Sequence, residues 1–170
     1  MLTAIAIVLG VLVVVMAVVY AMGSALPVNH VASVSKTVNA TPEQVWEALT
    51  DIDAMPSWRK ELKGIEKTEG KGGLPRWVEK SSFGDIPLQV EVSEKPSKLV
   101  TRIDDSKLPF GGKWTYALKP VGNQTEVAII EEGEVKPPIF RFMSKYIFGH
   151  TKTLQMYADQ LAAKFQKEAK

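Results

Sequence analysis

Residues 137–170 read PPIFRFMSKYIFGHTKTLQMYADQLAAKFQKEAK, and this stretch decides what the rest of the chain must form. At about 100° per residue, its large apolar side chains gather on one side of a helix and most of its charged side chains on the other. The apolar side consists of Ile139, Met143, Tyr146, Ile147, Leu154, Tyr157, Ala158, Leu161 and Phe165. The proline pair fits a helix start, because the first N–H groups of a helix have no helical partner. We therefore expect one amphipathic helix over residues 138–170, about 45 Å long, which needs an apolar sheet to cover it.

Length and composition favour one domain with an appendage. The chain has 170 residues, of which 45% are hydrophobic, and this suffices for a single core. Its formal net charge of +2 is too small, and its lysines are too scattered, to predict nucleic-acid binding. There is no cysteine, and the two histidines, His30 and His150, lie far apart in the sequence. We therefore expect no metal site and no cofactor.

The N-terminal segment predicts a membrane anchor. The first 35 residues contain no Asp, Glu, Lys or Arg, and residues 2–22 are almost entirely apolar. About 21 residues span roughly 31 Å as a helix, which is the thickness of the hydrocarbon layer of a bilayer. We therefore expect residues 1–27 to form a single-pass anchor with a short linker, and residues 28–170 to form the domain.

A cleaved signal peptide is the alternative for this segment. Ala21, Gly23 and Ala25 are small enough for a cleavage site, but the apolar run is long and no Lys or Arg precedes it. The nearest cation is Lys36, which follows the apolar run. By the positive-inside rule this favours a cell-membrane protein with its domain on the cytosolic side.

Helical and strand signals then alternate in a recognisable order. Thr41-Pro42-Glu43-Gln44 is a helix start, with a hydroxyl N-cap, a proline in the first turn and a glutamine that completes a capping box. A further helical turn at residues 54–58 places Trp58 inward. Alternating patterns predict seven strands, at residues 30–38, 62–68, 76–82, 86–94, 98–104, 113–120 and 125–134. Their short connections favour an antiparallel meander.

These elements make an α+β fold in which a curved antiparallel sheet grips one long C-terminal helix. Their order, the helix start TPEQVW at residues 41–46 and the inward Trp58 resemble the START-like or SRPBCC superfamily, within its polyketide cyclase/dehydrase and lipid-transport group. Several shorter segments resemble a membrane-anchored bacterial branch of that group. They are LPFGGKWTY (108–116), TEV (125–127), EEGE (131–134), FRF (140–142) and FGHT (148–151). The resemblance covers residues 31–165 and implies a helix-grip fold with an apolar cavity between helix and sheet.

A cavity in such a fold is lined by inward strand residues and by the apolar side of the helix. The expected ligand-binding wall is Trp58, Leu88, Val90, Val92, Trp114, Tyr116, Ile129, Met143, Ile147 and Leu154. Each of these side chains also suits ordinary core packing, so the case for a site is collective. A large apolar cavity with few polar groups suits a lipid, a polyketide or another hydrophobic molecule.

Two polar residues complete the expected ligand site. His150 falls on the apolar side of the helix, and Glu131 shares a strand face with Ile129. An inward-facing Glu131–His150 pair would suit acid/base chemistry in an aldol-type cyclisation. The alternative for His150 is a satisfied histidine in the core or at the cavity mouth. We assign no catalytic residue, and GGK at residues 111–113 lacks the rest of a phosphate-loop pattern.

The expected function is the membrane-anchored binding or carriage of a hydrophobic small molecule, with no preference for an oligomeric state. One alternative is a cyclase or dehydratase that acts on a bound polyketide-like substrate, and another is a membrane-tethered interaction module with a closed core. A buried carboxylate that faces a histidine favours the enzyme, an apolar cavity favours the carrier, and a filled core favours the module.

Overall fold

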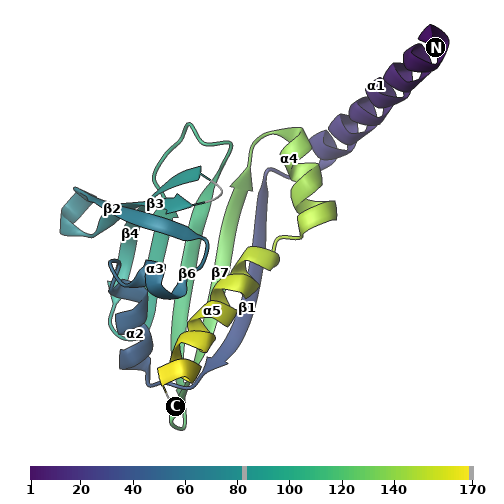
Figure 1. Ribbon diagram of the computed structural model, residues 1–170. Helices are drawn as coiled ribbons and strands as arrows, with labels where there is room; N and C mark the ends of the chain where they lie inside the picture. Colours follow the sequence, from purple (N-terminus) through teal and green to yellow (C-terminus); the bar gives the residue numbers. More distant parts are fainter. Residues whose placement is uncertain (82–83, 169–170) are drawn as a thin grey trace.

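The computed structural model describes residues 1–81 and 84–168, and its centre is one antiparallel sheet (Figure 1). Seven strands follow the order β1-β7-β6-β5-β4-β3-β2, so β1 pairs with the last strand and the others form a meander. The strands are β1 (Asn29–Val38), β2 (Leu62–Thr68), β3 (Arg76–Ser81), β4 (Gly84–Glu94), β5 (Lys98–Ile103), β6 (Phe110–Val121) and β7 (Gln124–Val135). This confirms the expected α+β helix-grip fold.

The helices lie at the ends of the sequence and between the first two strands. They are α1 (Leu2–Ala25), α2 (Pro42–Thr50), α3 (Met55–Trp58), α4 (Pro138–Met143) and α5 (Lys152–Glu168), with a 3-10 turn η1 (Lys71–Gly73) and a π-helical turn η2 (Ser144–Phe148). The capping box at the start of α2 is present. Gln44 N donates to Thr41 Oγ1 at 3.4 Å, and Thr41 N donates to Gln44 Oε1 at 2.9 Å.

The expected C-terminal helix is present as α5, but its expected start at residue 138 is wrong. α4 continues into η2, and Gly149 then turns the chain with a φ of 73° before α5 begins. Glycine adopts this φ without the steric penalty that a side chain brings. α4 and η2 contain no buried residue, and α4 packs on α1, whereas α5 packs on β1 and β7. The expected ends at residues 82 and 170 lie outside the described residues.

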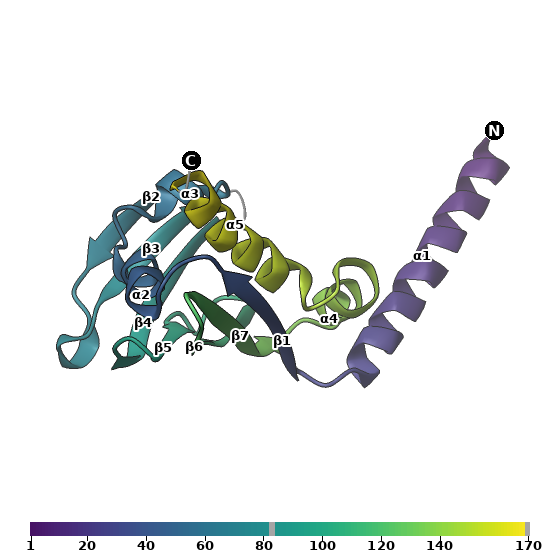
Figure 2. The same cartoon turned by 90° about the horizontal axis from the view of Figure 1, so that it is seen from below.

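α5 supplies one wall of the core. Leu154 and Leu161 are fully buried, and Tyr157, Ala158 and Phe165 are buried beside them. α2 and α3 lie on the same face of the sheet as α5, and the sheet curves around all three helices (Figure 2). The sheet therefore grips α5 at one side and the α2–α3 pair at the other.

The strand β4 departs from simple alternation. Its register with β5 shifts between Val90 and Val92, and the polar residue Gln89 is buried. The Gln89 side chain accepts a hydrogen bond from Lys71 N at 3.0 Å and donates to the carbonyl oxygens of Leu74, Pro75 and Val90. Gln89 thus lies on the opposite face from Leu88 and Val90, where its amide ties η1 to the sheet.

The packing of α5 predicts a strong asymmetry between its two faces. Leu154→Asp places a charge where no partner is available and is expected to lower the free energy of unfolding by several kcal/mol, about the whole stability of such a domain. Lys152 is exposed, so Lys152→Asp is expected to change the free energy of unfolding by less than about 0.5 kcal/mol. Urea unfolding of the full chain in detergent, followed by tryptophan emission, measures both. Equal losses would show that the helix faces are assigned wrongly.

Candidate functional site

A cavity of about 310 Å³ lies between the sheet and the N-terminal half of α5. Its lining comes from α5, from the α3–β2 connection and from five strands, namely Arg59, Glu79, Ile86, Leu88, Thr101, Ile103, Phe110, Gly112, Trp114, Tyr116, Glu131, Thr153 and Tyr157. The apolar side chains and the polar side chains are both well represented in this lining. The site is therefore amphipathic, and the expectation of a nearly apolar cavity needs correction.

A buried ion pair forms the most polar part of the cavity. Arg59 is 9% exposed and Glu79 is 5% exposed, and the Arg59 guanidinium contacts both carboxylate oxygens of Glu79. The Arg59 Nη2–Glu79 Oε2 distance is 2.9 Å, and Trp77 Nε1 donates to Glu79 Oε1 at 3.4 Å. A bidentate pair of this kind fixes the guanidinium plane and leaves its remaining face toward the cavity lining.

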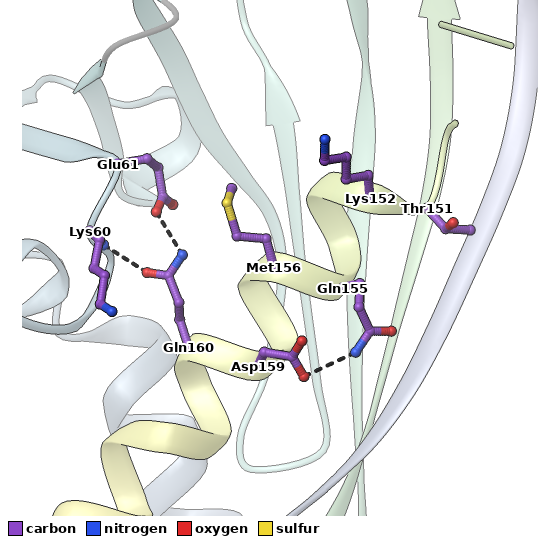
Figure 3. Close-up of a pocket in the computed structure, with 8 residues that line it drawn as sticks. All are labelled: Lys60, Glu61, Thr151, Lys152, Gln155, Met156, Asp159 and Gln160. Carbon is purple, nitrogen blue, oxygen red and sulfur yellow. Dashed lines mark hydrogen bonds between the residues drawn. The ribbon is translucent and has the colours of Figure 1, made fainter. Parts of the chain in front are cut away.

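A chain of hydrogen bonds connects this pair to the surface of α5. Arg59 Nε donates to Glu61 Oε1 at 2.9 Å, and Gln160 Nε2 donates to Glu61 Oε2 at 2.9 Å. Gln160 Oε1 also accepts from Lys60 N at 2.7 Å. Figure 3 shows Gln160 between Lys60 and Glu61, so one side chain of α5 holds the α3–β2 connection at two points.

The groove drawn in Figure 3 is a less suitable ligand site than the cavity. Its volume is about 780 Å³, but it is an open hollow on the outer side of α5. Its polar side chains already pair with one another, as the 3.0 Å hydrogen bond from Gln155 Nε2 to Asp159 Oδ1 shows. Enclosed apolar surface is what a small molecule needs for affinity, and the smaller cavity offers more of it.

Two tyrosines and a tryptophan form one wall of the cavity. The Tyr157 ring lies 5.4 Å from Tyr116 and 5.7 Å from Trp114 between centroids, and the Arg59 guanidinium lies 4.9 Å from the Tyr157 ring centroid. Burial raises the pKa of Tyr157 to about 12, and it raises the pKa of Tyr116 well above its usual value. Both hydroxyls therefore stay protonated and are able to donate hydrogen bonds.

Glu131 brings a second carboxyl to the cavity. Burial raises its pKa, and a hydrogen bond from Trp114 opposes the shift. Glu131 Oε1 lies 3.8 Å from His30 Nε2. His30 stacks on His150 with 3.9 Å between ring centroids, and Ser144 Oγ lies 3.2 Å from His150 Nδ1. The histidine that faces Glu131 is therefore His30, and the expected Glu131–His150 pair does not form.

The structure divides the expected wall residues into three groups. Those that line the cavity are Leu88, Trp114, Tyr116 and Glu131. Those that are buried in the adjoining core are Trp58, Val90, Ile129 and Leu154, whereas Val92 is half-buried beyond the bulge. Those that lie outside the cavity lining are Met143, Ile147 and His150. Met143 and Ile147 are displaced because the chain turns at Gly149, which separates α4 and η2 from α5. His150 follows that turn and stacks on His30.

Among the lining residues that sequence reasoning missed, Arg59, Glu79 and Tyr157 form the ion pair and part of the aromatic wall. Arg59 follows the inward Trp58 directly, and Glu79 shares one face of β3 with the buried Trp77, so both signals are local. Neither pattern shows that the two residues meet across the cavity. Within the described residues, no group of three or more histidines and carboxylates is arranged to hold a metal ion.

Comparison with known proteins agrees with this geometry. The family model described as polyketide cyclase / dehydrase and lipid transport matches residues 29–166. The chain belongs to this family. The resemblance noted in the sequence is thereby confirmed, and no curated protein sequence matches the chain.

Solved structures place this family member in the START-like fold. A START superfamily protein from Mycobacterium smegmatis has a TM-score of 0.67 at 19% identity, over 81% of this chain and 98% of that one. A norcoclaurine synthase point mutant from Thalictrum flavum, in complex with a transition-state analogue, has a TM-score of 0.65 at 14% identity, over 84% and 98%. A hypothetical protein from Helicobacter pylori has a TM-score of 0.65 at 13% identity, over 80% and 88%. At these identities the likeness shows the fold alone.

The Arg59–Glu79 pair predicts a large loss when one partner is removed. Glu79→Leu leaves the buried guanidinium without its bidentate partner, and we expect the free energy of unfolding to fall by about 3–5 kcal/mol. The double variant Arg59→Met/Glu79→Leu removes both charges and is expected to recover most of the lost free energy of unfolding. The more exposed pair Arg102–Glu91 is the control, where Glu91→Leu should cost less than about 1 kcal/mol. Urea unfolding measures all three, and a harmless Glu79→Leu would contradict the assignment.

The histidine stack predicts a loss of stability in mild acid. Burial lowers the pKa of His30 below its usual 6.5, and the nearby His150 adds to the effect. Burial also lowers the pKa of His150, and Lys145 contributes. The unfolded chain therefore binds more protons near that pH, so stability falls as the pH drops through about 6.5.

The matched variant is His30→Phe, which keeps a ring on His150 and removes one titrating group. We expect its thermal midpoint to decline less than that of the wild type between about pH 7.5 and about pH 5.5. The raised pKa of Glu131 acts in the opposite direction, because its protonated form is favoured in the folded state. The comparison is therefore repeated in the Glu131→Gln background. Parallel pH profiles for the wild type and the His30→Phe variant would contradict the prediction.

Proposed function

We propose that this protein is a membrane-anchored binding protein that holds a hydrophobic small molecule, a lipid or a polyketide-like compound, between its sheet and α5. The observation that carries the proposal is the 310 Å³ cavity, in which apolar side chains surround a buried ion pair. Leu88, Ile103 and Phe110 offer an apolar environment, whereas Arg59 and the tyrosine hydroxyls offer donors. This combination suits a molecule with an apolar body and one polar or anionic end.

The family and its structures support a cavity with this use. The family description includes lipid transport, and one norcoclaurine synthase structure with a TM-score of 0.63 is a complex with dopamine and hydroxybenzaldehyde. That enzyme thus accommodates small aromatic molecules on the same fold. An open cavity also argues against the interaction module with a filled core.

Two contacts support an anchor that is retained in the mature protein. α1 is an apolar helix that meets the length and hydropathy of a membrane span over Thr3–Ala25. Its end packs on α4, because Gly23 lies so close to Pro138 that a Cβ would fall 1.9 Å from the Pro138 carbonyl oxygen. Arg141 Nε donates to Gly23 O at 2.9 Å. Cleavage near Ala25 would remove both contacts, so they favour an anchor over a signal peptide.

We retain residues 1–27 as the anchor and residues 28–170 as the domain, with the cytosolic side favoured.

The cavity lies at the end of the sheet that is nearer to the anchor. Phe110, which lines the cavity, pairs with Val135 at the end of β7, and β7 leads directly to α4 and its contact with α1 (Figure 1). A ligand that leaves the bilayer therefore has a short path to the cavity. This arrangement fits the exchange of a membrane-soluble molecule.

One observation favours an enzyme as the second candidate. Glu131 faces the cavity with a raised pKa, and His30 lies 3.8 Å away. A carboxyl of this kind is a candidate general acid or base. The reaction would be a cyclisation or dehydration of a bound polyketide-like substrate, with Glu131 as the acid or base.

Ligand binding is tested by thermal unfolding and tryptophan emission of the full chain in detergent. A long-chain fatty acid is expected to raise the thermal midpoint, because binding to the folded state at 100 times Kd adds about 2.7 kcal/mol. It is also expected to change the emission of Trp114, which lines the cavity. Leu88→Trp fills the cavity and should abolish both responses. Val31→Trp, at a site that is 72% exposed, is the matched control.

The outcomes separate the candidates. If fatty acid, sterol and aromatic polyketide probes all leave both signals unchanged, the binding proposal fails. If a probe binds and is chemically altered, Glu131→Gln decides between carrier and enzyme. Loss of turnover with retained binding would assign the protein to the enzyme class.

A further inference from the structure

Four large apolar side chains form an exposed patch on α4 and η2. Phe140 is 52% exposed, Tyr146 53%, Ile147 59% and Phe148 56%, and they lie within nine consecutive residues. Single exposed apolar residues are normal on a protein, but four large ones within nine consecutive residues point to an interaction surface. We call Phe140, Tyr146, Ile147 and Phe148 the aromatic patch.

The aromatic patch lies beside the C-terminal end of α1. Both views place α4 against the last turns of this helix, close to where the chain enters β1 (Figures 1 and 2). The Gly23–Pro138 approach and the hydrogen bond from Arg141 Nε to Gly23 O fix the two segments together. A bilayer that contains α1 would therefore have its surface at the level of α4 and η2.

The charges around the patch indicate which surface it meets. Residues 135–158 contain no Asp or Glu, and they contain the cations Lys136, Arg141, Lys145 and Lys152. Cations next to exposed aromatic and aliphatic side chains are typical of segments that lie in the interface of an anionic bilayer. Tyr146 suits the headgroup level, and Lys145 is exposed and able to reach phosphate groups.

The hydrogen bonds of the Arg141 side chain are compatible with a position at the bilayer surface. Its Nε donates to Gly23 O at 2.9 Å and its Nη1 donates to Lys136 O at 3.0 Å. The last four carbonyl oxygens of a helix have no helical partner, and in an apolar surrounding each such group needs a donor. Gly23 O also accepts from Leu26 N at 3.2 Å, so Arg141 adds a second donor at this end of α1.

We propose that α4 and η2 lie in the interface of the bilayer that α1 spans, with the aromatic patch inserted among the lipid acyl chains and the flanking cations at anionic headgroups. This inference rests on the proposed membrane anchor and adds a second membrane-binding element to it. The turn at Gly149 allows it, because α4 and η2 leave the sheet while α5 stays on it. Two attachments, one spanning and one lying flat, hold the domain in a fixed orientation with its cavity end toward the lipid.

The test uses fluorescence quenching at single sites in the full chain. The chain contains no cysteine, so each single-cysteine variant carries one environment-sensitive label. The reporting sites are Ile147→Cys and Phe148→Cys, which are already exposed. Val13→Cys, in the middle of α1, reports the anchor. Val121→Cys, 49% exposed at the opposite end of β6, is the matched exposed control. The protein is reconstituted in vesicles of phosphatidylcholine and phosphatidylglycerol that contain a quencher at a shallow or a deep acyl position.

We expect the deep quencher to act most on Val13→Cys and the shallow quencher to act most on the two reporting sites. For these two sites, shallow quenching should exceed that at Val121→Cys by at least roughly threefold. Removal of phosphatidylglycerol at low salt should reduce the shallow quenching at these two sites, because the flanking cations then lose their anionic partners.

Each of the other outcomes overturns either the interfacial location of α4 and η2 or the membrane anchor itself. If Val13→Cys is quenched and the reporting sites behave like Val121→Cys, the inference fails and the anchor stands. If Val13→Cys is not quenched, the anchor itself fails. If the labels at residues 147 and 148 are shielded only as protein density in the vesicles rises, the patch binds a second copy of the chain and not lipid.

Discussion

The buried Arg59–Glu79 ion pair is the constraint on which the site depends. Charges taken out of water need partners with good geometry, and Arg59 receives its partners from β3 and from Glu61. Gln160 then links Glu61 to α5. Three parts of the fold are thus held at fixed distances. Because Arg59 and Glu79 both line the cavity, this network also fixes its charged groups in place.

The cavity has polar groups of two different kinds. At one side the Arg59 guanidinium and the tyrosine hydroxyls are donors whose protonation does not change near neutral pH. At the other side Glu131 and His30 both have shifted pKa values because of burial. A binding protein needs only the first kind to orient a ligand, whereas proton transfer needs the second. This division explains why one cavity supports two candidate functions, and why Glu131 is the residue that separates them.

The sequence predicted the sheet well because its signals are local. Alternation located all seven strands, and the capping box at Thr41 located α2. The C-terminal region was mispredicted for a physical reason. An amphipathic pattern does not say what a helix packs on, so α4 and η2, which bury no residue, and α5 on the sheet read as one helix. The Arg59–Glu79 pair was missed because its formation depends on where β3 lies relative to α3, and no local pattern contains that information.

The pairing of β1 with β7 has a consequence for how the protein is made. Asn29 pairs with Glu134, so the first strand finds its partner only after almost the whole domain has been synthesised. Contacts this distant in sequence form late, because chain entropy must be lost before they stabilise anything. The apolar α1 leaves the ribosome long before that moment. If α1 enters the bilayer as it emerges from the ribosome, β1 is held at the membrane surface with an unpaired edge until β7 is made. The sheet then closes at the membrane and not in free solution.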